Sequence, residues 1–363
     1  MKALAWLRDF GACLLCCAMA LSAQAQVGLQ QRVWTDPTRQ AWGSEAARPV
    51  KVTLWYPAAA GVPVQSLPAG PFDLEPVAIG AAAADSPRRL PLLLLSHGTG
   101  GSAMAMAWLG HALARQGYLV AAPDHHGNSA AEGSYQLEAF IAWWDRPRDL
   151  TVLLDRLLAD PVWGPRVDTQ RIGVIGFSLG GYTALASLGA RLDPQALQRF
   201  LEPCLKASSC PLPPEISARF QASDVSRALQ EGSGLQASLA DAGRDWRDGR
   251  IRAGLVLAPV HGRLTSQESL AGIQRPVHLI ASDADDQAPA ALTARLAASS
   301  LPAATLHVLS DATHYSFVSP CTAQGQQMAP AICADPKGFE RRALHEMLRR
   351  ETVAFFVRTL AEE

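Results

Sequence analysis

The feature that most constrains the fold of this chain is a repeated alternation of short apolar segments with helical segments. The apolar segments have the length and composition of buried strands, and helical patterns separate most of them. Strands that are buried on both faces and joined by helices form a mostly parallel sheet with helices on both sides. The sequence therefore predicts an α/β fold. The expected strands are 50–56, 92–96, 119–122, 172–177, 253–258, 277–281 and 305–309.

Two segments interrupt this alternation. Residues 58–90 are rich in Pro, Gly and Ala and are expected to form a loop insertion. Residues 193–250 form a polar, proline-marked stretch with short helical patterns between two expected strands. The position of this stretch is that of a small cap. We therefore expect a single α/β domain over 26–363 with a cap insertion at about 193–250.

The first 25 residues have the composition of a secretory signal peptide. Lys2 and Arg8 supply positive charge, an apolar run of 12 residues covers 10–21, and Ala23-Gln24-Ala25 offers a small-residue cleavage site. The run is shorter than the ~18 apolar residues that a membrane span needs. We therefore expect cleavage after Ala25, a periplasmic or secreted protein, and no stable membrane anchor.

Four of the seven cysteines remain once the predicted leader is removed. Disulfides persist in secreted and periplasmic proteins, and the four cysteines lie as two local pairs. This clustering favours Cys204–Cys210 and Cys321–Cys333 among the three possible connectivities. A zinc site fits less well, because there is no C-x-x-C motif and no nearby pair of histidines.

A serine between glycines stands at one junction of strand and helix. In "RIGVIGFSLGGYTAL", residues 171–185, a buried-strand pattern runs into Gly176-Phe177-Ser178-Leu179-Gly180 and then into a helical pattern. In a G-x-S-x-G turn of this kind the backbone is strained and the glycines avoid collisions, so that the serine hydroxyl is presented above the sheet. We interpret Ser178 as a nucleophile rather than as part of an ordinary turn.

A serine hydroxyl is a weak nucleophile, so Ser178 needs a histidine base and a carboxylate that orients this base. In this arrangement the acid and then the histidine follow the serine, each in a loop after a later strand. His314 comes just after the strand expected at 305–309 and is therefore the predicted base. The other histidines, including His261 after an earlier strand and His345 on a charged helix, are more simply structural.

The acid is expected in the loop after the strand at 277–281, where the sequence reads "DADDQAP". Asp283, Asp285 and Asp286 compete for this role. Asp285 is preferred, because it stands four residues before Pro289, a placement common for the acid in folds of this kind. Asp283 is the main alternative, and turn capping explains the aspartates that do not serve as the acid.

Two backbone N–H groups are expected to bind a developing oxyanion. Leu179 lies at the N-terminus of the helix that follows Ser178, where its N–H is available. The second donor is expected in the glycine-rich loop "SHGTGGS", and Thr99 is the predicted residue. His97 in the same loop is expected to brace it.

Composition and local motifs exclude several other classes of function. The chain is 48% hydrophobic with a formal net charge of −1 and no run rich in Lys or Arg, so nucleic acid is not an expected partner. Asp124, His125 and His126 are adjacent, and adjacent residues rarely converge on one metal ion. We therefore predict no metal and a loop that lines the pocket.

Trp143 and Trp144 could form an acyl-binding wall or simply pack in the core.

These motifs together resemble a known family. The segments "VKVTLWYPA", "LLLLSHGTGGS", "VAAPDHHGN", "DTQRIGVIGFSLGGYTAL" and "DATHYSFVSPC" are similar to those of the α/β-hydrolase proteins labelled predicted dienelactone hydrolases, which are similar to platelet-activating-factor acetylhydrolases. The resemblance covers most of the mature chain. It implies Ser178 as nucleophile, His314 as base, Asp285 as acid, and Leu179 with Thr99 as oxyanion donors. True dienelactone hydrolases carry cysteine where this chain has Ser178.

The resemblance and the motifs lead to one main functional hypothesis. We expect a secreted or periplasmic serine hydrolase that cleaves small-molecule carboxylic esters with a short or medium acyl group, without a cofactor. Peptidase, thioesterase and polyester hydrolase activities use the same residues and differ in pocket and leaving group. A non-catalytic binding protein on the same fold is the alternative from another class. The sequence specifies no oligomeric state.

Overall fold

The structure is a computed structural model that describes residues 26–67, 70–205, 210, 212 and 214–361. The predicted leader at 1–25 lies outside the described residues. Among the residues that are described, no helix is both long and apolar enough to cross a membrane.

One mixed sheet forms the centre of the described part of the chain. Its strands are β1 (Val27–Gln40), β2 (Ala47–Pro57), β3 (Ala78–Ile79), β4 (Leu90–Ser96), β5 (Leu119–Asp124), β6 (Val167–Phe177), β7 (Ile251–Leu257), β8 (Val277–Ser282) and β9 (Ala304–Leu309). Their order across the sheet is β3-β1-β2-β5-β4-β6-β7-β8-β9. The strands from β5 to β9 pair in parallel, whereas β2 pairs antiparallel with β1 and with β5. The predicted mostly parallel α/β sheet is thus confirmed.

Two strands, β1 and β3, were not predicted from the sequence. Only the start of β1 is apolar and buried, at Val27 and Leu29, and most of its remaining residues are polar and partly exposed. An antiparallel strand near the edge of a sheet needs one buried face at most, so its apolar pattern is weak. The short β3 lies inside the loop insertion expected at 58–90 and pairs in parallel with β1.

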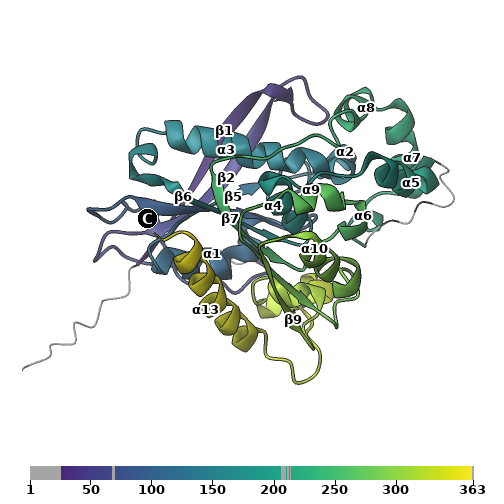
Figure 1. The fold of residues 1–363 in the computed structure, drawn as a ribbon. Helices are drawn as coiled ribbons and strands as arrows, with labels where there is room; N and C mark the ends of the chain where they lie inside the picture. The colour runs from purple at the N-terminus through teal and green to yellow at the C-terminus, as the bar shows by residue number, and fades with distance from the viewer. Residues whose placement is uncertain (1–25, 68–69, 206–209, 211, 213, 362–363) are drawn as a thin grey trace, which may run out of the picture.

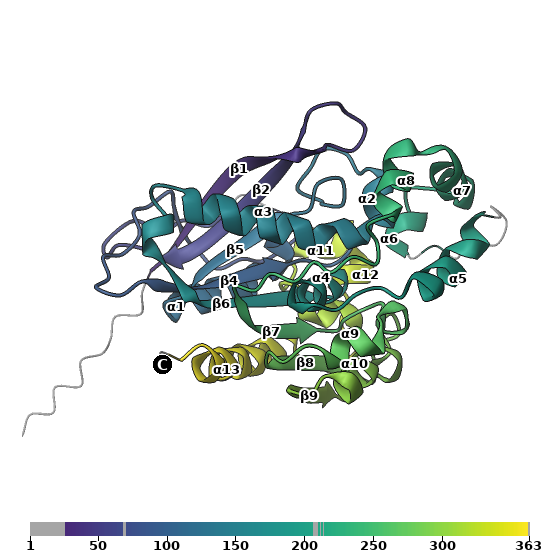
Figure 2. The ribbon, with the colours of Figure 1, turned by 45° about the horizontal axis from the view of Figure 1, so that its top comes forward.

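Helices cover both faces of this sheet, as predicted. Figure 2 shows α3 along one face and α13 along the other. The helices are α1 (Ala107–Arg115), α2 (Leu137–Ile141), α3 (Arg146–Ala159), α4 (Leu179–Leu188), α5 (Pro194–Leu205), α6 (Pro214–Ser217), α7 (Ala222–Glu231), α8 (Ser233–Leu239), α9 (Gln267–Ala271), α10 (Ala294–Ser300), α11 (Ala323–Met328), α12 (Pro330–Cys333) and α13 (Arg341–Thr359). Short 3-10 turns include η1 (Ala103–Met106), η2 (Trp143–Asp145) and η7 (His314–Phe317).

The apolar run in β4 supplies both layers of the core. Leu93 and Leu95 pack in the cluster that contains α1 and α13, whereas Leu92 and Leu94 pack in the cluster that contains α3 and α4. All four side chains are fully buried. Successive residues of a strand point to opposite faces, so a strand buried on both faces must be apolar at every position.

The segment 193–250, predicted to be a cap, contains the four helices α5 to α8 between α4 and β7. We call these four helices the inserted helices. They lie side by side at one end of the sheet (Figures 1 and 2). Leu197 of α5 and Val225 of α7 belong to a third apolar cluster, which also contains Leu179 and Tyr182 of α4. This cluster joins the inserted helices to the helix that follows Ser178.

Both predicted disulfides, Cys204–Cys210 and Cys321–Cys333, are present. The first joins the end of α5 to the chain that follows it. The second joins the end of α12 to the segment after η7, and Cys321 also forms a β-bridge with Phe72 of the loop insertion. The second disulfide therefore fixes a segment that lies directly after His314 in the chain.

We expect replacement of both Cys321 and Cys333 by serine to lower thermal stability. The bond spans 12 residues, and a loop of that length contributes about 3 kcal/mol in the chain-entropy model. Thermal unfolding followed by circular dichroism measures the change. The wild-type protein treated with reductant loses both disulfides and should therefore unfold at a temperature at least as low as that of the double variant. An unchanged midpoint in the double variant would contradict this role.

Candidate active site

The backbone around Ser178 explains the glycines of its motif. Ser178 lies between β6 and α4 and has a φ of 55°, in a region that residues other than glycine rarely occupy. A Cβ atom on Gly176 would lie 1.9 Å from the carbonyl oxygen of Gly180, and one on Gly180 would lie 2.0 Å from that of Ser96. Any side chain at either position would collide with backbone. The glycines are therefore required for the turn that presents Ser178.

The structure brings Ser178, His314 and Asp285 together. His314 Nε2 lies 2.8 Å from Ser178 Oγ, and His314 Nδ1 lies 2.8 Å from Asp285 Oδ2. Because a carboxylate only accepts hydrogen bonds, Nδ1 of His314 carries the hydrogen and Nε2 is free to accept the serine proton. This is the arrangement in which a histidine activates a hydroxyl.

Asp285 is held in place by its own loop. Its Oδ1 accepts hydrogen bonds from the backbone N–H groups of Gln287 and Ala288 at 3.0 and 2.8 Å, while its Oδ2 faces His314. Asp285 is 2% exposed. Asp283, by contrast, is exposed and pairs with Arg295 at 3.1 Å. Of the aspartates considered for the acid, Asp285 is thus the one that contacts the histidine.

The two predicted oxyanion donors lie beside Ser178, one in a loop and one at the start of a helix. Thr99 follows β4 and Leu179 begins α4, and both line the same cavity as Ser178 and His314. The loop of Thr99 is braced, because the N–H of the next residue, Gly100, donates to the side chain of Asn128 at 2.5 Å. One loop and one helix N-terminus therefore line the same cavity.

This active-site cavity has a volume of about 480 Å³, which is in the range of small-molecule sites. The rest of its wall is mostly apolar. The lining residues include two carboxylates and no Lys or Arg. The segment that contains the inserted helices, together with the end of α2 and the turn η2 after it, provides most of the wall. Six of the apolar lining residues are Phe140, Trp143, Phe200, Leu212, Ile216 and Val225.

A hydrogen bond ties this wall to the loop of the histidine. Tyr315 follows His314, and its hydroxyl donates to Glu215 of α6 at 2.6 Å. Trp143 lines the cavity, which agrees with the interpretation of this tryptophan as part of a binding wall. Trp144 is fully buried, and its indole N–H donates to Ser238 of α8, so this second tryptophan has the packing role.

A buried charged network, not predicted from the sequence, lies behind the loop of Thr99. Asp149 of α3 accepts from His125 Nδ1 at 2.7 Å and from Arg39 of β1 at 2.6 Å. His125 also contacts Ser96 Oγ at 2.9 Å, and His97 Nε2 accepts from the N–H of His125 at 3.2 Å. His97 therefore braces the loop as expected, whereas His125 is a buried link rather than a residue that lines the active-site cavity.

The charges of this network stabilise one another. Burial raises the pKa of Asp149, but the positive charge of Arg39 and the hydrogen bond from His125 outweigh it and hold the pKa well below its usual range. Burial lowers the pKa of His125 to about 4. Because the pKa of Asp149 is lower in the folded than in the unfolded state, its stabilisation is present at neutral pH and is lost as the pH falls through the folded value.

We expect Asp149→Asn to destabilise the protein by about 3–5 kcal/mol, because it leaves the buried charge of Arg39 without its full partner. Urea unfolding at pH 7 measures the free energy of unfolding. Glu346→Gln is the matched control, because Glu346 pairs with Arg349 and Arg350 on the exposed surface of α13 and should change the stability by less than about 1 kcal/mol. Equal effects of the two substitutions would contradict the account.

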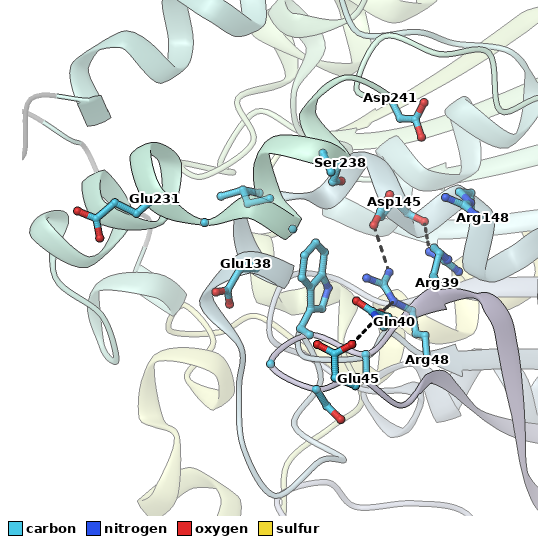
Figure 3. A pocket seen from close by; sticks show the side chains of 18 residues that line it. Arg39, Gln40, Glu45, Arg48, Glu138, Asp145, Arg148, Glu231, Ser238 and Asp241 are labelled. Atoms are coloured by element: carbon cyan, nitrogen blue, oxygen red, sulfur yellow. Dashed lines mark hydrogen bonds and ion pairs between the residues drawn. The ribbon is translucent and has the colours of Figure 1, made fainter.

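A second cavity, of about 830 Å³, lies between the loop joining β1 to β2 and the helices α7 and α8. Figure 3 shows its charged lining. Arg48 pairs with Asp145 at 3.2 Å and also lies over the ring of Trp42. Arg39 reaches the carbonyl oxygen of Asp145 at 3.2 Å. None of the predicted site residues lines this cavity. Of its two buried arginines, Arg39 belongs to the network of Asp149 and Arg48 pairs with Asp145.

The described residues contain no group of three His, Cys, Asp or Glu side chains arranged to hold a metal ion. Asp124, His125 and His126 do not converge. Asp124 accepts from the N–H of Ala103, and His126 pairs with Glu132. Each therefore has a separate structural partner.

Comparison with known proteins agrees with this architecture. The model of the alpha/beta hydrolase family matches residues 92–324, which include the serine, the aspartate and the histidine. Among solved structures, a ferulic acid esterase from Streptomyces cinnamoneus matches with a TM-score of 0.60 over 94% of this chain and 92% of that chain, at 21% sequence identity. At this identity the likeness shows the fold alone. No curated protein matches the sequence.

Proposed function

The chain belongs to the alpha/beta hydrolase family, and we propose that it hydrolyses carboxylic esters through an acyl-enzyme on Ser178. The observation that carries the proposal is the pair of 2.8 Å contacts that link Ser178, His314 and Asp285. These contacts and the strained backbone of Ser178 are the features expected of a serine hydroxyl that is activated as a nucleophile. The three side chains come from loops at the same edge of the parallel strands.

In the proposed mechanism, Ser178 Oγ attacks the ester carbonyl carbon while His314 Nε2 takes the serine proton. The carbonyl π electrons move to oxygen, and the N–H groups of Thr99 and Leu179 bind this oxyanion. Collapse of the tetrahedral intermediate expels the alcohol, which receives the proton from His314. Water then attacks the acyl-enzyme with the same base and releases the acid. Asp285 holds the imidazole in place and stabilises the positive charge that forms each time His314 takes a proton.

We extend the proposal to the substrate and the location. The cavity of about 480 Å³ fits an ester with a short or medium acyl group, and segment 193–250 acts as a cap over it. Two disulfides fit a secreted or periplasmic protein. The relation to predicted dienelactone hydrolases is proposed only at the level of the motifs. The solved neighbour is named for an esterase, which is compatible with ester cleavage here.

A panel of p-nitrophenyl esters with acyl chains from acetate to palmitate tests the proposal. We expect turnover of the short and medium esters and a steep fall for the longest chains, since the cavity is bounded by the inserted helices. A peptide anilide and an acyl thioester of the same acyl group serve as comparison substrates. Turnover of the anilide or thioester alone would indicate a peptidase or a thioesterase. No turnover of any substrate would favour a binding protein on this fold.

A further inference from the structure

One histidine of the active-site cavity has no part in the proposed mechanism. His261 follows β7 and lines the cavity that contains Ser178 and His314. Its carbonyl oxygen accepts from Leu264 N–H and from Thr265 Oγ1. Within the described part of the chain, no group hydrogen-bonds the ring nitrogens of His261. A polar ring without a protein partner is therefore part of the cavity wall.

The position of this ring is fixed by backbone and by packing. His261 has a φ of 62° and the nearby Ala258 a φ of 43°, and such strained backbone is found preferentially at functional sites. The imidazole stacks on Trp143, with ring centroids 4.4 Å apart and planes 16° apart. It also meets Tyr182 edge to face, with centroids 6.0 Å apart. The stacking holds the imidazole in one orientation against the cavity.

The chemistry of the wall restricts the ligand. Burial lowers the pKa of His261 to about 4, so at neutral pH the ring is uncharged and offers one N–H donor and one acceptor. Glu215 and Asp286 are the carboxylates of the lining, and no Lys or Arg lies among the lining residues. An anionic ligand would meet only like charge there. Phe140 and Phe200 add aromatic surface, which favours a flat apolar group.

We propose that this cavity binds the aryl group of neutral esters and that His261 hydrogen-bonds a polar substituent on that aryl ring. The inference rests on the proposed ester hydrolysis at Ser178 and names its substrate class. The aromatic wall accommodates the ring. A polar group that a bound substrate covers and leaves unpaired carries a cost, so substrates that pair with His261 are favoured over analogues that do not. A phenol hydroxyl suits either tautomer of His261, because it both donates and accepts.

Two pairs of esters test the inference. Methyl 3-(4-hydroxyphenyl)propanoate is compared with methyl 3-phenylpropanoate, and 2-(4-hydroxyphenyl)ethyl acetate with 2-phenylethyl acetate. The saturated linkers insulate the ester from the electronic effect of the hydroxyl, and the two pairs place the aryl group on the acyl or on the alcohol side. Methyl butyrate is included as an ester without a ring, and product formation is measured by chromatography.

We expect the wild-type protein to prefer the hydroxylated member of at least one pair by about 3–10-fold in kcat/KM, as one neutral hydrogen bond provides. His261→Phe keeps an aromatic ring but removes the ring nitrogens. His261→Asn tolerates the positive φ, but its shorter side chain does not reach as far into the cavity. In both variants the ratio should fall to about 1. His307→Phe, on β9 and not part of the cavity lining, is the matched control and should keep the wild-type ratio.

The outcomes separate this inference from the proposed function. If the wild-type protein hydrolyses methyl butyrate but shows no preference in either pair, or keeps its preference in both His261 variants, the role of His261 is wrong and ester hydrolysis stands. If methyl butyrate is cleaved faster than all four esters that carry a ring, the proposed aryl group of the substrate is wrong. If none of the five esters is hydrolysed, both the proposed function and the inference that depends on it are overturned.

Discussion

Ser178→Ala should reduce ester turnover by about 10⁴–10⁶-fold, because no other hydroxyl takes the position from which Oγ attacks. The reduction should appear in kcat rather than in KM, since the cavity wall is unchanged. Initial rates with p-nitrophenyl butyrate measure the effect, and circular dichroism shows whether the variant folds. A folded Ser178→Ala protein with wild-type turnover would contradict the mechanism.

Ser299→Ala is the matched control for this substitution. Ser299 lies on the exposed surface of α10, where its hydroxyl donates to the carbonyl oxygen of Leu296. Loss of this single exposed hydrogen bond should leave turnover within about twofold of wild type, because surface substitutions away from the site have small effects. Equal losses in the two variants would point to a general effect on the protein instead of the removal of a nucleophile.

Asp285→Asn should lower kcat by about 10⁴-fold, because an amide in place of the carboxylate favours the wrong tautomer of the histidine. The geometry behind this expectation is the 2.8 Å contact between Asp285 Oδ2 and His314 Nδ1. Asp283→Asn provides the control within the same loop, since Asp283 is exposed and pairs with Arg295. We expect this second variant to keep turnover within about threefold of wild type. The reverse order of effects would assign the acid to Asp283.

The sequence was sufficient to predict most of the parallel sheet and the elbow at Ser178, because both depend on local patterns. Apolar strands and the glycines beside Ser178 can be recognised without knowledge of the fold. The chain order of serine, acid and histidine then narrowed the candidates, and the structure brings Asp285 and His314 to the serine. The catalytic roles of these residues stay predictions until turnover is measured.

The parts that the sequence did not predict depend on contacts between distant residues. Arg39 and Asp149 are 110 positions apart in the chain, and a charged residue in a polar strand such as β1 carries no local sign of burial. The charges in "RPRD" and "PDHHG" were the available signal, because both motifs adjoin apolar segments that are buried. The place of His261 after an earlier strand favours a structural role, and its stacking on Trp143 could not be predicted because this contact joins two distant segments of the chain.

Labelling of the purified protein with a fluorophosphonate probe tests the central claim most directly. The probe reacts covalently with a serine that an adjacent base has activated. Digestion followed by mass spectrometry identifies the modified residue. We expect one major adduct, on Ser178, that is lost in His314→Ala. No labelling of the folded wild-type protein, or a major adduct on a different serine, would contradict it.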